Sequence, residues 1–442
     1  MRIVIAGAST TGSYLAKLLQ LEKHDLVIID NNKKRIQSLQ EHFDAQVVMG
    51  DAADATIIEP LIDENVDLFI SLTSSDSINI ISTLIARKFG AKRAIVRIND
   101  PNNLIHPLLT DDPNVFLLNP EMIVSKDLSR LVGTPSADEV DFFAKGKAEM
   151  ATLHLAKDSP ASGKPIKDIK FPTSWLVVAT ISDGNFVIAS GDTVLSADDQ
   201  VLVVGDPNKY QEMATLFGHK SKKISRVVLV GFNETSAKLS QSLARKEIEV
   251  RLIENDTDLA QVAAAELDGV LVLQGDVTDD DILEQAGVAD ADYLIALTDD
   301  DEENVLISLL AKEKGVAKVI ALIQKNHYRK VIQKIGIDTV INPRSAMVDE
   351  VIRLIHRKDL LAISILEGGQ GRMMEFVVNQ KTRLVDKPLS KVKLPKQILI
   401  GAIIRGDDLI IPKGDSKLKV GDHVVVFSTM SVFTEVKKLF GN

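Results

Sequence analysis

The sequence predicts an α/β protein in which two doubly wound parallel-sheet domains are each followed by a small α+β domain. The prediction rests on a long internal repeat, on the alternation of short apolar runs with helical patterns, and on the length. The chain has 442 residues, which is room for about three domains of ordinary size. Hydrophobic residues make up 45% of the chain and charged residues 26%, so the composition is that of a globular protein.

The internal repeat is visible as landmarks that recur at a nearly constant distance. The segment Arg2–Gly7 returns as Arg226–Gly231, and Lys164-Pro165 returns as Lys387-Pro388 after almost the same interval. Other pairs that keep this interval are Asp30 with Glu254, Gly50-Asp51 with Gly275-Asp276, Leu72-Thr73 with Leu297-Thr298, Asn79 with Asn304, and Gly191-Asp192 with Gly414-Asp415. This register indicates a tandem duplication of a unit that spans half of the chain.

The first part of each unit alternates strand-like and helix-like segments. In the first copy the expected strands are Ile3–Ala6, Leu26–Ile29, Gln46–Met49, Leu68–Leu72, Ala94–Ile98 and Val115–Leu118. The segments with helical patterns between them are Gly12–Leu21, Lys33–His42, Ile57–Ile62 and Ile78–Phe89. This alternation is typical of a parallel sheet covered on both faces, and six strands fit a Rossmann-like domain.

The second part of each unit is predicted to be a small α+β domain. Its expected elements in the first copy are strands at Ala151–Leu155, Leu176–Ile181, Val187–Ile188 and Gln200–Val204, and a helix at Pro207–Leu216. Asp183-Gly184-Asn185 predicts a hairpin turn, and Arg405–Asp408 is the matching turn of the second copy. We therefore divide the chain into residues 1–135, 136–221, 222–355 and 356–442, in which sheet domains and α+β domains alternate.

Charge and composition exclude several classes of protein. With 52 Lys and Arg against 62 Asp and Glu, the net charge is −10, which disfavours nucleic-acid binding. The sequence has no cysteine, so disulfides, thiolate metal sites and cysteine nucleophiles are excluded. No apolar stretch approaches the roughly 20 residues of a membrane span, and the first residues do not have the pattern of a secretory signal. We expect a cytoplasmic protein.

The turn after the first strand has the spacing of a dinucleotide-binding loop. It follows the pattern G-x-S-x-x-G from Gly7 to Gly12, between a strand and a helix, where backbone amides receive a pyrophosphate. Ser9 stands where a glycine is usual, and the second copy departs further with Asn233 and Ser236 in place of glycines. The candidate ligands are Gly7, Ala8, Ser9, Thr10 and Thr11 in the first turn and Gly231, Phe232, Asn233, Glu234 and Thr235 in the second. The alternative is an ordinary tight turn in each copy.

A carboxylate ends the second strand of each sheet. Asp30 follows Gly7 at the same spacing at which Glu254 follows Gly231. A carboxylate at this position accepts hydrogen bonds from an adenosine ribose and repels a 2′-phosphate, which favours NAD over NADP. The alternative is a solvent-exposed strand end or a helix N-cap.

Polar side chains also follow the third, fourth and fifth strands, at the carboxyl edge where ligands bind in open α/β sheets. The candidates are Asp51, Thr73, Ser74 and Arg97 in the first copy and Asp276, Thr298, Asp299 and Gln324 in the second. Arg97 is able to clamp a phosphate, whereas its equivalent in the second copy is the neutral Leu322, which Gln324 and Lys325 follow. We therefore expect the two copies to prefer different ligands. Helix capping is the alternative role for Asp51, and a helix start or a cation site is the alternative for Asp299–Glu303.

No catalytic constellation accompanies these loops. None of the eight histidines forms a metal pair at helical spacing, and no tyrosine is followed by a lysine four positions later. A G-x-S-x-G elbow and a phosphate-loop lysine are also missing from the sequence. We therefore predict no catalytic residues and no metal ligands. An NAD-dependent oxidoreductase with tandem domains is the alternative function, and a structural scaffold is a third.

With these landmarks the chain resembles the TrkA family, the cytosolic subunits of bacterial and archaeal Trk potassium-uptake systems. The units of that family are RCK domains, each with a nucleotide-binding N-terminal lobe and a C-terminal lobe. The resemblance covers essentially all 442 residues. It rests on the Gly7–Gly12 turn, Asp30, Gly50-Asp51, Leu72–Asp76 and Arg97, and on Glu254, Gly275-Asp276, Leu297–Glu302 and Leu322–Gln324.

The resemblance implies a tandem RCK architecture that binds NAD(H) and adenine nucleotides such as ATP and ADP at the candidate residues named above. It implies a homo-oligomer, a tetramer forming a ring, that is attached to the inner face of the membrane through a Trk-type potassium-transporting subunit. Nucleotide binding would then change the shape of the ring and gate or activate uptake.

Overall fold

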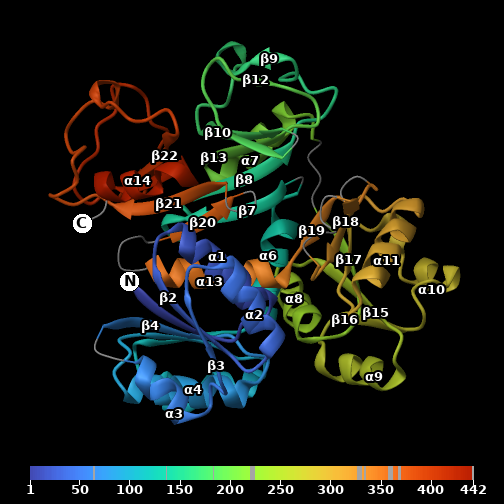
Figure 1. Cartoon of the computed structure of the whole chain (residues 1–442). Helices are drawn as coiled ribbons and strands as arrows, with labels where there is room; N and C mark the ends of the chain where they lie inside the picture. The colour runs from blue at the N-terminus through green and yellow to red at the C-terminus, as the bar shows by residue number, and fades with distance from the viewer. Residues whose placement is uncertain are drawn as a thin grey trace. The chain divides into compact units, whose positions relative to one another are not determined.

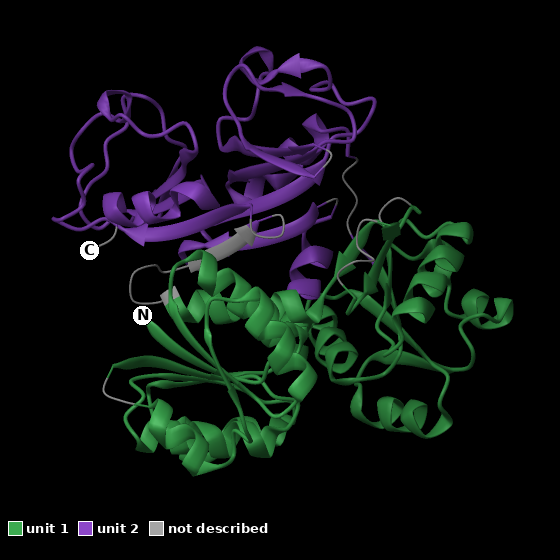
Figure 2. Cartoon of the chain, in the orientation of Figure 1, with its two compact units in different colours: residues 1–126, 226–355 green, residues 127–225, 356–442 purple. Residues whose placement is uncertain are grey.

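The computed structural model describes residues 1–62, 65–135, 137–182, 184–219, 224–325, 331–332, 335–356, 362–366 and 370–440 (Figure 1). The chain divides into two compact units, coloured green and purple in Figure 2. The first unit joins Met1–Lys126 to Arg226–Ile355, and the second joins Asp127–Ser225 to His356–Asn442. Each unit therefore gathers corresponding parts of the two repeats. The finer division at residues 135, 221 and 355 stays a prediction.

The first repeat contributes a six-stranded parallel sheet to the first unit. Its strands are β1 (Arg2–Ala6), β2 (Asp25–Asp30), β3 (Gln46–Met49), β4 (Val66–Ser71), β5 (Ala94–Arg97) and β6 (Val115–Leu118). The helices are α1 (Thr10–Leu21), α2 (Lys33–His42), α3 (Ala55–Ile58), α4 (Asp76–Lys88), α5 (Pro107–Thr110) and α6 (Pro120–Gly133). The strand order is β3-β2-β1-β4-β5-β6, which confirms a Rossmann-like sheet. Because the order reverses between β1 and β4, the loops after these strands frame a crevice.

The second repeat builds the same sheet again. Its strands are β14 (Arg226–Val230), β15 (Glu249–Glu254), β16 (Val270–Gln274), β17 (Tyr293–Ala296), β18 (Lys318–Leu322) and β19 (Thr339–Ile341), in the order β16-β15-β14-β17-β18-β19. The helices are α8 (Glu234–Ala244), α9 (Thr257–Glu266), α10 (Asp280–Gln285), α11 (Asp301–Glu313) and α13 (Pro343–His356). The second crevice therefore lies between the loops that follow β14 and β17.

Most of the predicted strands and helices are confirmed with bounds that differ by one or two residues, and β3, β6 and α2 begin and end where the sequence predicted. The helix predicted at Ile57–Ile62 is different. It begins earlier, because Asp54 accepts a hydrogen bond from the Thr56 N–H at 2.8 Å and caps α3. It also ends at Ile58 and continues as a 3₁₀ turn, Glu59–Leu61, because Pro60 has no N–H for a helix interior.

The second unit contains two antiparallel sheets of five strands. The first sheet has β7 (Ala137–Phe143), β8 (Ala148–His154), β10 (Trp175–Ser182), β11 (Asn185–Ile188) and β13 (Gln200–Gly205). The second has β20 (Ala362–Leu366), β21 (Gly371–Val377), β22 (Ile398–Arg405), β23 (Asp408–Ile410) and β24 (His423–Thr429). A small pair, β9 (Lys164–Pro165) with β12 (Val194–Leu195), and the helices α7 (Tyr210–Leu216) and α14 (Phe433–Phe440) complete the unit. Among the described residues, no helix of either unit is long and apolar enough to cross a membrane.

One aliphatic core joins the two sheets of the second unit. Buried Met150 and Val204 of the first sheet belong to the same cluster as Met373 and Phe427 of the second. Both predicted hairpin turns are confirmed. Ser182 pairs with Asn185, although Asp183 itself lies outside the described residues, and Arg405 pairs with Asp408.

Glu149 of β8 is a carboxylic acid inside this second unit, and only 2% of it is exposed. Burial raises the pKa of its carboxyl to about 7 from an ordinary value of 4.5, and a hydrogen bond from Thr134 offsets part of the rise. Between these two pH values the folded chain holds the proton more tightly than the unfolded chain does. The contribution of Glu149 to stability therefore falls as the pH rises through this window.

Replacing Glu149 with Gln is expected to raise the free energy of unfolding by about 2–3 kcal/mol at about pH 8. At about pH 5 the gain should be less than about 1 kcal/mol, because the native carboxyl is already neutral there. Urea unfolding of both proteins at the two pH values measures the difference. An effect of the same size at both pH values would contradict this account.

Candidate functional site

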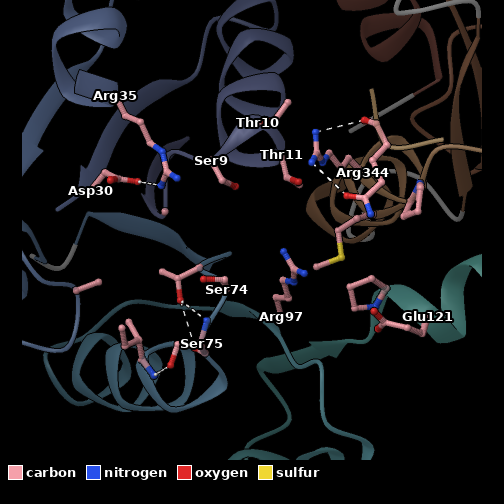
Figure 3. Close-up of a pocket in the computed structure, with 18 of the residues that line it drawn as sticks. Ser9, Thr10, Thr11, Asp30, Arg35, Ser74, Ser75, Arg97, Glu121 and Arg344 are labelled. Atoms are coloured by element: carbon pink, nitrogen blue, oxygen red, sulfur yellow. Dashed lines mark hydrogen bonds and ion pairs between the residues drawn. The ribbon is translucent and has the colours of Figure 1, made fainter. Parts of the chain in front are cut away.

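A pocket of about 450 Å³ lies in the first unit, at the carboxyl edge of the first sheet (Figure 3). It receives side chains from both repeats. The predicted residues that line it are Gly7, Ser9, Thr10, Thr11, Asp30, Asp51, Thr73, Ser74 and Arg97 from the first repeat and Asn233, Thr235, Asp299 and Gln324 from the second. The predicted residues outside its lining are Ala8, Gly231, Phe232, Glu234, Glu254, Asp276 and Thr298. The structure therefore gathers most of the first candidate site and only part of the second.

The first turn needs both of its glycines for space. Gly7 has φ +103°, and a Cβ there would lie 3.0 Å from the backbone of Leu72 and Thr73. A Cβ on Gly12 would lie 2.0 Å from the Gly7 carbonyl oxygen. Ser9 is the N-cap of α1, and its side chain makes no capping hydrogen bond with any described residue. The start of this twelve-residue helix therefore keeps amide donors, with the hydroxyls of Ser9, Thr10 and Thr11 around them, for an anion in the pocket.

The second turn is closed by its own side chains. Asn233 caps α8, because its Oδ1 accepts from the Ser236 N–H at 3.0 Å and the Ser236 Oγ accepts from the Asn233 N–H at 2.9 Å. The Asn233 side-chain amide also donates to the Leu297 carbonyl at 2.7 Å. These bonds satisfy donors that a phosphate would otherwise use. The substitutions seen in the sequence thus change how the helix start is capped.

The carboxylates that end β2 and β15 are buried and already engaged. Asp30 accepts from the Ala8 and Asn32 N–H groups, each at 2.7 Å, and from the Arg35 guanidinium at 3.4 Å. Glu254 accepts in the same way from the Phe232 N–H at 2.6 Å and the Asp256 N–H at 2.8 Å. Neither is a helix cap, because Asn32 caps α2 and Asp256 caps α9. Each carboxylate therefore holds two turns of its crevice together by hydrogen bonds, and this structural role is separate from any contact with a ligand.

The Asp residues that follow the third strands make short local turns. Asp51 accepts from the Ala53 N–H at 2.9 Å, and Asp276 accepts from the Thr278 N–H at 2.8 Å. The hydrogen bonds from Thr278 hold the pKa of the Asp276 carboxyl below its ordinary value. The helix-capping role belongs instead to their neighbours Asp54 and Asp279.

A buried asparagine fixes the loop after the fourth strand in each repeat. The Thr73 N–H and hydroxyl both donate to the Asn79 Oδ1, at 2.9 and 2.6 Å. The Asn79 side-chain amide in turn donates to the Thr73 and Arg97 carbonyls, both at 3.0 Å. Asn304 makes the equivalent bonds to the Thr298 and Leu322 carbonyls at 2.9 Å. Asn79 therefore positions the end of β5, from which Arg97 projects.

Arg97 faces the pocket and is held in place by its neighbours. Its Nε donates to the Asn99 Oδ1 at 2.9 Å. Burial lowers the pKa of the guanidinium, and the nearby carboxylates of Glu121 and Asp76 oppose this effect. An arginine stays charged in spite of such a shift. The prediction that Arg97 points into the first crevice agrees with its position in Figure 3.

Arg344 is a pocket residue that the sequence reasoning missed. It belongs to the second repeat, stands at the start of α13, and donates to the Gln324 carbonyl and side-chain oxygen at 3.3 and 3.2 Å. Its charge is close enough to Arg97 to contribute to the lowered pKa of that residue. Its equivalent in the first repeat is Glu121, which also lines the pocket. The signal that could have found the pair is the Asn-Pro dipeptide that precedes both residues.

The acidic run of the second repeat has mainly structural contacts. Asp300 caps α11 by accepting from the Glu303 N–H at 2.8 Å. Asp301 accepts from the Gln324 and Lys325 N–H groups at 2.8 and 2.9 Å. Lys325 pairs with Glu302 at 2.7 Å. Among the residues that the structure describes, no group of three or more acidic or histidine side chains is arranged to hold a metal ion.

Comparisons with known proteins agree with this architecture. The TrkA-N domain model matches residues 3–110 and 227–343, and the TrkA-C domain model matches residues 150–218 and 373–441. A Trk system potassium uptake protein TrkA homolog of Archaeoglobus fulgidus is 34% identical over 442 residues, which is all of both chains. Trk system potassium uptake protein TrkA of Vibrio alginolyticus is 28% identical over 100% of this chain and 98% of its own.

Solved structures share the fold at lower identity. The GsuK RCK domain has a TM-score of 0.61 and 19% identity, and the match covers 98% of this chain and 94% of that one. The structure described as the GsuK channel bound to NAD has a TM-score of 0.60 and 18% identity, with 98% of this chain and 78% of that chain covered. The fold is therefore that of tandem RCK domains. Because the family models match most of the chain and the Archaeoglobus relative is similar over its full length, the chain belongs to the TrkA family.

Proposed function

We propose that this chain is the regulatory subunit of a Trk-type potassium-uptake transporter and that it senses adenine nucleotides and NAD(H). The observation that carries the proposal is the pocket at the start of α1, where the helix start lacks a side-chain cap within the described structure and Arg97 and Arg344 converge. Helix amides and arginines are the groups that bind phosphate in proteins. Potassium transport enters the proposal from the relatives, which are named as Trk system potassium uptake proteins.

The ligand proposed for the first crevice is a nucleotide with a charged phosphate chain, such as ATP or ADP. A volume of about 450 Å³ is within the range of small-molecule sites. The phosphates would lie against the amides of α1 and between Arg97 and Arg344, with the adenosine toward Asp30 and Asp51. The second crevice, whose turn is capped by Asn233, would suit the less charged NAD(H) better.

The proposed gating step depends on the fact that the two pocket arginines belong to different repeats. Arg97 belongs to the first repeat and Arg344 to the second, so a phosphate chain that contacts both binds one arrangement of the repeats more tightly than another. A ligand shifts a conformational equilibrium only through such a difference in affinity. Binding in the first crevice would therefore change the shape of the first unit, and this change would reach the transporter.

The assembly proposed is a homo-oligomer, a tetramer forming a ring beneath the membrane subunit. Matched apolar side chains stand exposed on the two sheet domains, with Ile81 at 45% and its equivalent Leu306 at 50% exposure. Ile105 and Leu108 of the first sheet domain are exposed as well, at 78% and 63%. Where exposed apolar side chains gather into a patch, they mark an association surface. They support contacts between copies, and the ring would attach to the inner face of the membrane through the transporter.

The proposal makes the chain a binding protein and not an enzyme. The described lining of the pocket contains no histidine, lysine or tyrosine to act as the acid or base of a hydride transfer to a second substrate. The NAD-dependent oxidoreductase is therefore the second candidate. Following the absorbance of NADH during incubation with candidate substrates separates the two, and turnover would favour the oxidoreductase.

The proposed role is tested by potassium uptake in cells. Deletion of the gene is expected to lower uptake from a medium poor in potassium, and the wild-type chain should restore it. A chain with Arg97 and Arg344 both changed to Ala should be present at the same level but should restore uptake poorly. Uptake that does not change when the gene is deleted would contradict the transport function.

A further inference from the structure

We infer that the α+β domain of the second repeat carries a surface that binds anionic phospholipid headgroups. We call this surface the basic face and define it by nine cations on the loops between β21 and β22 and between β23 and β24. They are Lys381, Arg383, Lys387, Lys391, Lys393, Lys396, Lys413, Lys417 and Lys419. The inference rests on the proposed function in placing the chain at a membrane.

The charge of this domain is opposite to that of the whole chain. Residues 373–441 contain twelve Lys and Arg against seven Asp and Glu, a net charge of +5, whereas the chain as a whole has −10. The equivalent residues of the first repeat, 150–218, contain five Lys and Arg against eight Asp and Glu, a net charge of −3. The positive charge is therefore confined to one of two domains with the same fold.

Backbone hydrogen bonds hold the two loops of the basic face side by side. The Asp386 N–H donates to the Leu418 carbonyl at 2.9 Å, and the Leu389 N–H donates to the Ser416 carbonyl at 3.0 Å. The Ser390 N–H donates to the Gly414 carbonyl at 2.8 Å. These bonds place the lysines before and after residue 389 next to those around residue 416. The loops are drawn in orange and red at the upper left of Figure 1.

All nine cations are exposed, and none forms an ion pair with another described residue. Two acids nearby are already used, because Asp422 pairs with Arg405 at 2.9 Å and Asp407 pairs with Lys147 at 2.6 Å. The two loops themselves also contain Asp386 and Asp415, which offset only a minor part of the nine positive charges. The basic face therefore keeps a net positive charge, which attracts anionic groups that approach the domain.

The first repeat shows that the fold does not require these cations. The same loop pairing occurs there, since Pro165 pairs with Val194 as Pro388 does with Lys417. Only two of the nine equivalent positions keep a lysine. The nine equivalents, in order, are Asp158, Pro160, Lys164, Asp168, Lys170, Thr173, Ser190, Val194 and Ser196. The basic face thus serves a partner rather than the stability of the domain.

The residue types favour a lipid surface over a macromolecule. Eight of the nine cations are lysines, which are depleted in protein interfaces, where arginine and aromatic residues are enriched. The cytoplasmic loops of membrane proteins also carry excess positive charge, which would repel the basic face. Residues 379–422 contain no aromatic side chain on which a nucleic-acid base could stack. The negative inner leaflet of a membrane suits a cluster of exposed lysines.

The test is co-sedimentation of the full chain with vesicles of phosphatidylcholine alone and of phosphatidylcholine with phosphatidylglycerol. The test variant changes Lys391, Lys413, Lys417 and Lys419 to Ser. The control variant removes the same charge from the first repeat, with Lys157, Lys164, Lys170 and Lys209 changed to Ser. Each lysine at an anionic surface contributes about fivefold to partitioning, so the test variant, which loses four, should bind several hundredfold more weakly, about 600-fold if the contributions multiply. The control variant should lose less than about threefold.

Added salt should release the wild-type chain from the anionic vesicles, and neutral vesicles should not bind it. Equal binding to both kinds of vesicle would overturn the inference, and so would equal losses in the two variants. Binding of ATP, measured on the same samples, should be unchanged in both variants. A wild-type chain that binds ATP but no vesicle would therefore refute the lipid surface while leaving the proposed function intact.

Discussion

Replacement of Arg97 by Ala is expected to weaken ATP binding in the first crevice by about ten- to a hundredfold. The guanidinium projects from the end of β5 into the pocket, where Asn99 holds its Nε at 2.9 Å and Asn79 holds its carbonyl at 3.0 Å. A charge-assisted pair with a phosphate would be lost, and Arg35 is not placed to replace it, because it lies beside Asp30 (Figure 3). NAD carries fewer charges on its phosphates, so its affinity should fall less.

Arg344→Ala is the companion variant, and Lys325→Ala is the matched control. Lys325 is a cation of the second crevice that already pairs with Glu302 at 2.7 Å, so its removal should change ATP affinity little. If one phosphate chain contacts both arginines, the losses in Arg97→Ala and Arg344→Ala should not add in the double variant. Titration calorimetry of the wild type and these four variants gives the affinities. Intact ATP binding in Arg97→Ala, together with its loss in Glu254→Ala, would mean that the ligands were assigned to the wrong crevices.

Replacement of Asp30 by Ala is expected to lower the free energy of unfolding by about 2–5 kcal/mol and to weaken nucleotide binding as well. The sequence assigns Asp30 to the ligand, and the structure adds a role in holding the fold, because the Ala8 and Asn32 N–H groups both donate to the buried carboxylate at 2.7 Å. Removing it leaves two donors of the crevice without their acceptor.

Glu254→Ala provides the control for Asp30→Ala, since Glu254 accepts from the Phe232 and Asp256 N–H groups in the same way. It should cost a similar amount of stability and leave ATP binding in the first crevice unchanged. Urea unfolding gives the stability of each variant, and titration at a temperature where all are folded gives the affinity. An Asp30→Ala chain as stable as the wild type would contradict the role of this carboxylate in holding the turns.

Much of the fold could be predicted because the core strands and helices have recognisable local patterns of apolar residues. Short aliphatic runs such as Ile3–Ala6 predicted the strands of the parallel sheets. The nearly constant interval between repeated landmarks predicted that there are two such sheets. The strand β7 was missed because its sequence, Ala137–Phe143, mixes charged and apolar residues at a sheet edge, where most side chains are only half-buried. The packing of like domains into two units was also beyond local patterns, because it depends on contacts between residues in different halves of the chain.

The part of the candidate site that is built by a single repeat could be predicted from the sequence. Gly7, Asp30 and Arg97 lie at the carboxyl ends of three strands of one parallel sheet, so the sequence places them at the same edge. In the structure these residues line one pocket. Arg344 and Glu121 were missed because each begins a helix after the last strand, and Arg344 reaches the first pocket from the other repeat. A motif in one repeat cannot report contacts made by the other.

An equilibrium titration of the wild-type chain with ATP, ADP, NAD and NADH tests the central claim most directly. We expect ATP to bind at one site per chain, in the first crevice, and to bind much more weakly to Arg97→Ala. Failure of all four nucleotides to bind the folded chain would contradict a nucleotide-sensing role. Binding of ATP with equal affinity to both crevices would contradict the assignment of ATP to the first crevice, because only the first turn lacks a capping side chain within the described structure.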